Sequence, residues 1–254
     1  MDRVPECGED YVRNLTEEKS IRAGAIIVAA GKGERMGLGE AAPKALIELE
    51  GRPLAWHSLA KFESEPRIKA IALVVPPGTA DRCREEIVEK WKLHKVSAIV
   101  DGGLSRQESV RLGLDALAQD LDPVLIHDAA RPLVTAELVS LCLEMGAASG
   151  ACVPAIPIAG TVKAVSPQRQ IQETVDRTGL WEAQTPQAFA SSLIRQAHRR
   201  AKETGLEGTD DSSLVEALGT AVTVVQGSPE NLKVTWPVDL EVARAILKRR
   251  RHGG

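Results

Sequence analysis

The sequence predicts an α/β fold built on a doubly wound, mostly parallel sheet. Apolar runs of strand length alternate with longer amphipathic stretches, as in proteins made of repeated strand–helix units. The first run, residues 25–30 (AIIVAA), is apolar throughout, which is typical of a parallel strand buried on both faces. Glycines and acids directly follow several of these runs, and the ends of such strands are where ligands bind.

The first part of the chain is expected to contain four strand–helix pairs. Pro76, Pro77 and Gly78 end one apolar run, and Thr135 is a suitable N-cap for the fourth helix. The predicted strands cover residues 25–30, 70–75, 96–100 and 123–127, and the predicted helices cover residues 54–62, 81–91, 105–117 and 135–145.

The second part of the chain begins differently. Two short β-prone runs, residues 161–165 and 171–175, flank a turn-forming stretch and predict a hairpin. We expect this hairpin to project from the sheet as an arm over about residues 157–180. Beyond the arm the pattern predicts helices over residues 191–202, 211–218 and 238–250, and a strand over residues 221–225.

Composition suggests an ordinary globular protein. The 254 residues contain no internal repeat, so we expect one domain over residues 23–254 after a mobile extension over residues 1–22. No apolar run approaches the length of a membrane span and the four cysteines form no CxxC pair, so a cytoplasmic location without membrane partners is expected. A net charge of −3 and 3% aromatic residues predict no nucleic-acid partner, and the basic residues 248–251 are interpreted as a solvated helix end.

The loop after the first predicted strand has the residues of a phosphate-binding site. Gly31 and Gly33 would let backbone N–H groups approach phosphate oxygens closely, although these glycines alone would equally fit a plain tight turn. Arg35 and Lys44 add two positive charges, which a triphosphate needs, above all in its transition state. The spacing of a Walker loop is absent, and Met36 occupies the third glycine position of a dinucleotide fingerprint. The loop therefore predicts a nucleoside triphosphate site.

This loop resembles that of the nucleotidyltransferases that activate sugar or polyol phosphates, in which a GxGxRM pattern precedes Pro-Lys. Later segments are similar to one branch, the 2-C-methyl-D-erythritol 4-phosphate cytidylyltransferases, and the resemblance runs from about residue 25 to about residue 243. These segments are Asp101-Gly102-Gly103 with Arg106 and Ser109, and residues 127–132 (HDAARP), 174–177 (TVDR), 185–187 (TPQ) and 231–235 (NLKVT). The resemblance implies a Rossmann-like nucleotidyltransferase fold and transfer of a cytidylyl group from CTP to methylerythritol phosphate in the non-mevalonate isoprenoid route.

The resemblance also implies roles for individual residues. The nucleotide would be bound by Ala29, Ala30, Gly31, Gly33, Gly103, Ser109, Asp128 and Ala129. The catalytic cations would be Arg35, Lys44, Arg177 and Lys233, and the acceptor would contact Arg131, Thr161 and Thr185. Arg131, Thr161 and Arg177 would come from a neighbouring subunit through the arm, so the implied assembly is a homodimer.

The implied chemistry requires few protein groups. A phosphate monoester has a second pKa of about 6, so the acceptor is already a dianion near neutral pH and can attack the α-phosphorus without a general base. Pyrophosphate then leaves, and Mg²⁺, the implied cofactor, would offset the repulsion between the two anions. Asp128 is the one side chain considered as a neighbour of that ion, and no catalytic histidine or cysteine is expected.

Other conspicuous residues have simpler structural interpretations. His127 is more readily a structural histidine at a strand end than a base, and Asp210 and Asp211 fit a helix N-terminus better than a metal pair. Trp181 and Trp236 are expected to pack in the core or the arm rather than stack on cytosine.

Two departures from the family pattern affect the details of the site. Ala45 follows Lys44 where many relatives carry glutamine, and Leu104 follows the glycine pair where some carry an acid. The alternatives are a sibling enzyme, such as a ribitol 5-phosphate cytidylyltransferase, and a nucleotide-binding regulator without catalysis. The contexts of Thr161, Arg177 and Thr185 favour the erythritol substrate over ribitol. Cations on both sides of the reacting phosphates argue against the regulator.

Overall fold

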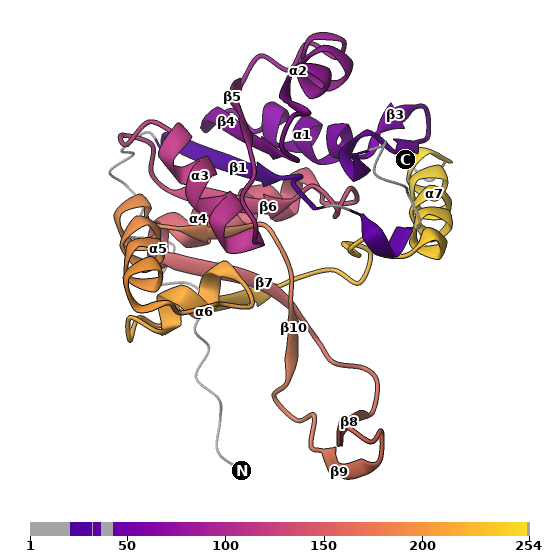
Figure 1. The fold of residues 1–254 in the computed structure, drawn as a ribbon. Coiled ribbons are helices and arrows are strands. Elements are labelled where there is room, and N and C mark those ends of the chain that lie inside the picture. Colours follow the sequence, from indigo (N-terminus) through magenta and orange to yellow (C-terminus); the bar gives the residue numbers. More distant parts are fainter. Residues whose placement is uncertain (1–20, 32, 37–42, 253–254) are drawn as a thin grey trace, which may run out of the picture.

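The computed structural model describes residues 21–31, 33–36 and 43–252, and its centre is one eight-stranded sheet with helices on both faces (Figure 1). The strands of this sheet are β1 (Ala23–Val28), β4 (Ile68–Val75), β5 (Val96–Asp101), β6 (Val124–Asp128), β7 (Ala151–Pro157), β10 (Trp181–Ala183), β11 (Gln187–Phe189) and β12 (Thr223–Gln226). Two small ladders pair β2 (Glu48–Leu49) with β3 (Arg52–Pro53), and β8 (Val162–Val165) with β9 (Ile171–Val175).

The helices alternate with the strands along the chain. The longer ones are α1 (Leu54–Ser64), α3 (Arg106–Ala116), α4 (Ala136–Ser149), α5 (Ser191–Thr204) and α7 (Pro237–His252). The shorter ones are η2 (Glu34–Met36), η3 (Lys44–Leu46), α2 (Ala80–Cys83), η4 (Arg84–Glu89) and α6 (Asp211–Glu216). Among the described residues, no helix combines the length and apolar character that crossing a membrane requires.

Strands β5, β4, β1 and β6 lie side by side in this order and run parallel. Val28 at the end of β1 lies beside Val74 of β4 and Asp128 of β6, and Val75 lies beside Asp101 of β5. The segments that follow β1, β5 and β6 therefore meet at one edge of the sheet. The predicted doubly wound, mostly parallel sheet is confirmed.

The other half of the sheet contains antiparallel strands that the sequence analysis did not predict. Strand β7 pairs antiparallel with β10 and β11 on one side and parallel with β12 on the other. Pro154 in the middle of β7 argues against a central strand, although its carbonyl accepts a hydrogen bond from the Gln184 N–H at 2.7 Å. Strands β10 and β11 have three residues each, too few for a pattern to reveal them.

Two hydrophobic clusters cover the two faces of the sheet. One cluster joins α1, η4 and α4 to the face that carries Ala25 and Ile27, and the other joins α3, α5 and α6 to the face that carries Ile26. This alternation within β1 explains why its sequence is apolar throughout. A third, smaller cluster around Leu49 and Val234 packs beneath α7.

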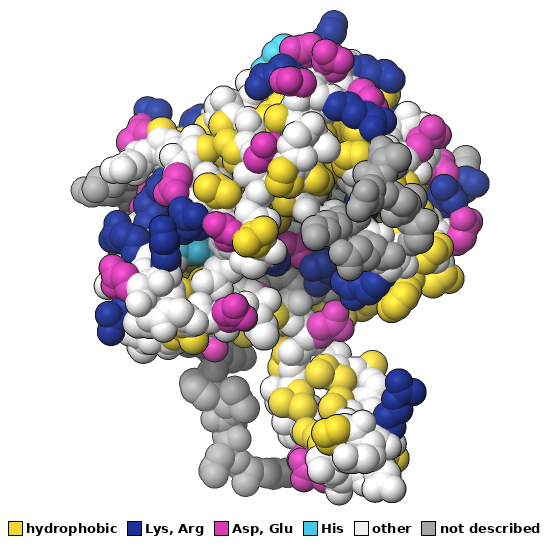
Figure 2. Space-filling view, viewed as in Figure 1, with side chains coloured by type: hydrophobic (Ala, Val, Ile, Leu, Met, Phe, Trp, Pro, Cys, Tyr) yellow, Lys and Arg dark blue, Asp and Glu magenta, His cyan; other side chains and the backbone are white. Residues whose placement is uncertain are grey.

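The β8–β9 hairpin forms the predicted arm. It projects from the body of the molecule beyond the end of β7 and the start of β10 (Figure 1). Hydrophobic side chains gather on its surface (Figure 2), and among them Val165 and Ile171 are 51% and 64% exposed. The arm therefore presents apolar area that the described part of its own chain does not cover.

Several predicted boundaries are corrected. Strand β1 begins at Ala23 and ends at Val28, and the helix predicted over residues 81–91 is a short α-helix that continues as the π-helix η4. The extension predicted over residues 1–22 lies outside the described residues as far as residue 20. Arg22 belongs to the folded part, because it forms a β-bridge with Asp122 and an ion pair with Asp120 at 3.4 Å.

Candidate active site

A cavity of about 560 Å³ lies at the edge where the parallel strands end. Its volume is within the range of small-molecule sites. Eleven of the predicted site residues line this cavity: Ala29, Ala30, Gly31, Gly33, Arg35, Lys44, Gly103, Ser109, Asp128, Ala129 and Lys233. Lys32, in the same loop, lies outside the described residues.

The loop after β1 forms one wall of this cavity. The Ala29 N–H donates to the Val74 carbonyl at 2.7 Å, so the chain follows the sheet for one residue beyond the strand. Gly33 has a φ of +69°, a conformation that favours glycine, and the 3₁₀ turn η2 follows it. This turn places Arg35 at the cavity wall and buries Met36 in the cluster beneath α7.

The glycine pair after β5 forms the opposite wall. A Cβ on Gly102 would lie 2.3 Å from the Ala30 Cβ, so only glycine allows this close approach of the two loops. The Gly103 N–H donates to the Ser109 hydroxyl at 3.1 Å, and the Ser105 side chain caps the N-terminus of α3. Leu104 is fully exposed at the tip of this loop.

Asp128, at the end of β6, is a buried carboxylate held by two cations. Its Oδ1 accepts from Arg106 Nε at 2.9 Å, and its Oδ2 accepts from Lys233 Nζ at 2.6 Å. Burial would raise the pKa of Asp128, but the charges of Arg106 and Lys233 outweigh it and hold the pKa far below its usual value. The carboxylate is therefore ionised throughout the physiological range.

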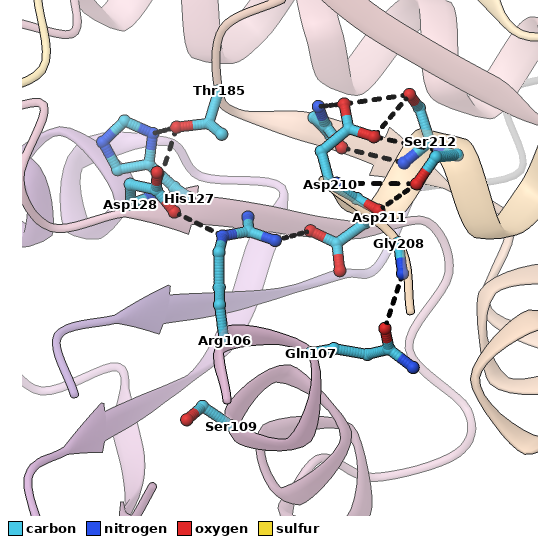
Figure 3. A network of polar contacts seen from close by, with 12 residues as sticks. Arg106, Gln107, Ser109, His127, Asp128, Thr185, Gly208, Asp210, Asp211 and Ser212 are labelled. Atoms are coloured by element: carbon cyan, nitrogen blue, oxygen red, sulfur yellow. Dashed lines mark hydrogen bonds and ion pairs between the residues drawn. The ribbon is translucent and has the colours of Figure 1, made fainter. Parts of the chain in front are cut away.

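Arg106 connects this carboxylate to a second one on another element. Its Nη1 donates to Asp211 Oδ2 at 2.8 Å, so its guanidinium bridges β6 and α6 (Figure 3). Asp211 is 1% exposed and its other oxygen contacts His198 Nε2 at 3.2 Å. Burial would raise the pKa of Asp211, and the charge of Arg106 together with the His198 hydrogen bond keeps it below its usual value.

The sequence analysis missed Arg106 and Asp211 as site residues, and one signal could have revealed them. Arg106 is the first residue of α3, where the helix dipole disfavours a cation. A cation in that position needs acidic partners from elsewhere in the fold. Asp210 carries out the predicted capping role alone, because its side chain accepts from the Ser213 N–H, while Asp211 is the ion-pair partner.

Two further cations face the cavity beside Lys233. Lys44 Nζ donates to the Val234 carbonyl, and the guanidinium carbon of Arg35 lies 5.9 Å from the centre of the Trp236 ring. Burial of Lys44, followed by the charges of Lys233 and Arg35, lowers its pKa from 10.5 to about 8. The cations that line the cavity therefore repel one another, and an anionic ligand would relieve this repulsion.

His127 lies behind the cavity in a polar network that also includes Thr185. Its Nδ1 lies 2.9 Å from the Thr185 hydroxyl, which also accepts from the Asp128 N–H at 3.1 Å (Figure 3). Burial lowers the pKa of His127 to about 4, so the ring is neutral and fixes the end of β6. The structural interpretation of this histidine agrees with its complete burial.

The remaining predicted residues do not line the cavity. Arg131 is 6% exposed and its guanidinium donates to the carbonyls of Asn231 and Ala183, while Thr185 is 4% exposed. Thr161 and Arg177 are exposed on the arm, where Arg177 donates to the Ala159 carbonyl. A single chain thus brings together the predicted nucleotide half of the site and Lys233, and leaves the acceptor residues apart.

Two expectations about surface residues need correction. Trp181 and Trp236 are 44% and 53% exposed, so neither is packed in the core, while packing in the arm stays a prediction. The basic end of α7 is not simply solvated, since Arg250 pairs with Glu230 at 2.9 Å and Arg251 pairs with Glu50 at 3.1 Å.

The described lining of the cavity offers a metal ion a single carboxylate, so such an ion would be bound mainly through a ligand that arrives with it. Asp128 is the one carboxylate among the described residues that line the cavity, and both of its oxygens already accept from cations. No group of three or more His, Cys, Asp or Glu residues suited to a metal occurs in the described part of the chain. Mg²⁺ commonly takes one or two carboxylates and completes its shell with phosphates and water, which this arrangement permits.

Comparison with known families matches residues 23–249 to the family model described as 2-C-methyl-D-erythritol 4-phosphate cytidylyltransferase. The chain is similar to the protein of that name from Alkaliphilus metalliredigens, 42% identical over 228 residues that cover 90% of this chain and 94% of the relative. It is also similar to the one from Geobacillus kaustophilus, 45% identical over 231 residues, 89% of this chain and 97% of the relative.

Solved structures give the same result. The crystal structure of 2-C-methyl-D-erythritol 4-phosphate cytidylyltransferase from Thermus thermophilus matches with a TM-score of 0.72 and 34% identity, over 88% of this chain and 98% of that one. The structure of 4-diphosphocytidyl-2C-methyl-D-erythritolsynthase from Anaerococcus prevotii matches with a TM-score of 0.77 and 30% identity, over 91% of this chain and 97% of that one.

The buried Arg106–Asp211 pair makes a prediction for stability. Asp211→Asn should lower the free energy of unfolding at pH 7 by about 1–3 kcal/mol, because Arg106 stays desolvated with one charged partner fewer. The folded pKa of Asp211 is lower than its unfolded value of 3.8, so this contribution is present above that value and lost as the pH falls through the folded pKa. Urea unfolding of both proteins at pH 7, 5 and 3 should show that the difference shrinks at the lowest pH.

Asp115→Asn is the matched control, since it removes an exposed acid whose partner Arg111 is also on α3. It should change the free energy of unfolding by less than about 0.5 kcal/mol. Equal losses in the two variants would show that the buried pair has no special contribution.

Proposed function

The chain belongs to the 2-C-methyl-D-erythritol 4-phosphate cytidylyltransferase family, and from this premise we propose how its cavity carries out the family's reaction. It is a nucleotidyltransferase that transfers the cytidylyl group of CTP to 2-C-methyl-D-erythritol 4-phosphate in the non-mevalonate isoprenoid pathway. The products are 4-diphosphocytidyl-2-C-methyl-D-erythritol and pyrophosphate. The observation that carries our proposal is the gathering of Arg35, Lys44 and Lys233 around one cavity at the carboxyl edge of the sheet.

Charge neutralisation is the main task of this cavity. The acceptor phosphate and the triphosphate are both anions, and their approach is the principal obstacle to reaction. Arg35 and Lys44 would bind the triphosphate, and Lys233 would face the reacting phosphates from the opposite side. The acceptor phosphate then attacks the α-phosphorus in line with the departing pyrophosphate, and no protein base is required.

The cytidine would occupy the space between the two glycine loops. Backbone groups of Ala29, Ala30 and Gly31 on one side, and of Gly103 with Ser109 on the other, offer hydrogen bonds to the base and ribose. Gly33 would contribute to the phosphate cradle, while Asp128 and Ala129 would lie toward the ribose and the phosphates. Buried polar partners of this kind discriminate strongly against a base that lacks the matching groups.

Asp128 is the residue that would lie nearest a Mg²⁺ ion bound together with CTP. Such an ion would neutralise part of the phosphate charge, and the triphosphate would supply most of its ligands. Arg106 and Lys233 hold Asp128 in place at the cavity floor, so this carboxylate orients the surrounding cations whether or not an ion is present.

The acceptor is proposed to bind between two subunits of a homodimer. Thr161 and Arg177 lie on a projecting arm with exposed apolar residues, which is a feature expected of a segment that contacts a second copy. The arm of one subunit would then complete the cavity of the other, adding Arg177 as a fourth catalytic cation. Arg131 and Thr185 neither line the cavity nor lie on the arm, and they would contact the acceptor from near the end of β6. The cytoplasmic location stays a prediction.

The proposed function is tested directly by mixing the protein with CTP, Mg²⁺ and methylerythritol phosphate. Phosphorus NMR should show the coupled signals of a diphosphate diester together with free pyrophosphate. Ribitol 5-phosphate in a parallel reaction should give a kcat/KM at least about tenfold lower, because only the acceptor contacts differ. Equal or faster turnover of ribitol phosphate would overturn the assigned acceptor, and no product with either would overturn the activity.

The homodimer is tested by mixing two inactive variants. Lys44→Ala disables the cavity and Arg177→Ala disables the arm, so each should lower turnover by about 10²-fold or more when alone. In an equal mixture of exchanging subunits, half of the dimers are mixed and one of their two sites is intact, so about a quarter of wild-type activity should return.

The matched control mixes Lys44→Ala with Lys233→Ala. These two residues line the same cavity of one chain, so no mixed dimer contains an intact site and activity should not return. Failure of the first mixture to recover above this control would contradict an arm that acts across the dimer.

A further inference from the structure

One short segment contacts or carries three of the four described cations that line the cavity, namely Arg35, Lys44 and Lys233. This cation segment, residues 233–236, carries Lys233 itself, and its Val234 carbonyl accepts from Lys44 Nζ. Its last residue, Trp236, places its ring 5.9 Å from the guanidinium carbon of Arg35. The position of this segment therefore sets the position of all three charges.

The cation segment is fixed at two points. At its centre, the Val234 N–H donates to the Ala130 carbonyl at 2.8 Å and the Val234 side chain is fully buried. At its end, Oδ2 of Asp239 accepts from the Thr235 N–H and from the Trp236 N–H, both at 2.7 Å. Asp239 lies in the first turn of α7, so a single carboxylate ties the segment to that helix.

The ordinary interpretation of Asp239 is a helix cap. An acidic residue in the first turn that reaches back to preceding N–H groups stabilises a helix N-terminus. A cap, however, requires only an acceptor oxygen, which asparagine or serine can also provide. The negative charge has a second effect here, because Lys44 lies among cations.

We propose that Asp239 is a positioning residue for the reaction: it holds the cation segment against Lys44 and adds a negative charge on the α7 side of the cavity cations. The inference rests on the proposed function of Lys44 in binding the triphosphate. The charged groups that face Lys44 are Lys233 and Arg35, which disfavour its protonated form, and Asp128 and Asp239, which favour it.

Asp128 raises the pKa of Lys44 more than Asp239 does, but its two oxygens are already engaged by Arg106 and Lys233, whereas Asp239 acts from the first turn of α7. With the pKa of Lys44 lowered to about 8, a small change in the local charge alters the protonated fraction near physiological pH. Removing the charge of Asp239 should therefore shift the alkaline limb of the pH profile of kcat/KM to lower pH. It should do so without removing any group that touches the substrate.

The test compares variants at residue 239 in the full-length protein. Asp239→Asn and Asp239→Ser keep an oxygen for the two N–H groups and remove the charge, while Asp239→Glu keeps the charge. The kcat/KM for CTP should fall above pH 8 in the wild type, because free Lys44 loses its proton there. In the two uncharged variants the limb should move to lower pH, so that kcat/KM relative to wild type is about threefold or more lower at pH 8.5 than at pH 7.

Glu241→Gln is the matched control, since it removes one charge from the same helix at an exposed residue paired with Arg244. This variant and Asp239→Glu should keep the wild-type limb. A second readout does not depend on activity: the pH midpoint of Lys44 acetylation by acetic anhydride in the free protein, followed by peptide mass spectrometry, should fall in Asp239→Asn and Asp239→Ser. Thermal melting confirms that each variant is folded.

Uncharged variants with the wild-type acetylation midpoint, or with activity reduced equally at every pH, would overturn the inference and leave Asp239 as a cap. Shifted acetylation midpoints in Asp239→Asn and Asp239→Ser, together with no cytidylyl transfer by the wild-type protein, would instead count against the proposed function alone. The two failures are therefore distinguishable.

Discussion

The double ion pair of Asp128 is the interaction on which the rest of the site depends. Its carboxylate joins Arg106 at the start of α3 to Lys233 near the C-terminal end of the chain. Burial opposes this ionised carboxylate, so it persists only because both oxygens accept from cations. Through Arg106 the same network reaches Asp211 on α6, which ties three distant parts of the sequence to one edge of the sheet.

This arrangement gives the cavity lining more positive than negative charge. Arg35, Lys44 and Lys233 face the same space, and burial together with the charges of Lys233 and Arg35 lowers the pKa of Lys44. A bound triphosphate would remove the repulsion and raise that pKa again. The site thus has its charges fixed before the substrate arrives, which is the electrostatic preorganisation that phosphoryl and nucleotidyl transfer require.

The sequence predicted those features that arise from residues close together in the chain. The apolar run of β1 and the glycines and cations that follow it belong to one continuous segment, so both the strand and the phosphate loop could be identified. Strands β7, β10 and β11 could not, because Pro154 interrupts the pattern of one and the others are too short. The Arg106–Asp211 pair was also missed, since its residues are 105 positions apart and meet only in the folded chain.

The central claim is that Asp128 acts mainly by positioning the cations around it, and Asp128→Asn tests this claim most directly. Asparagine keeps the shape and one acceptor oxygen but removes the charge that anchors Lys233. Calorimetric binding of CTP with Mg²⁺ should stay within about threefold of wild type or become tighter, while kcat falls at least about tenfold. Unchanged turnover, or CTP affinity and turnover that fall by the same factor, would contradict the account.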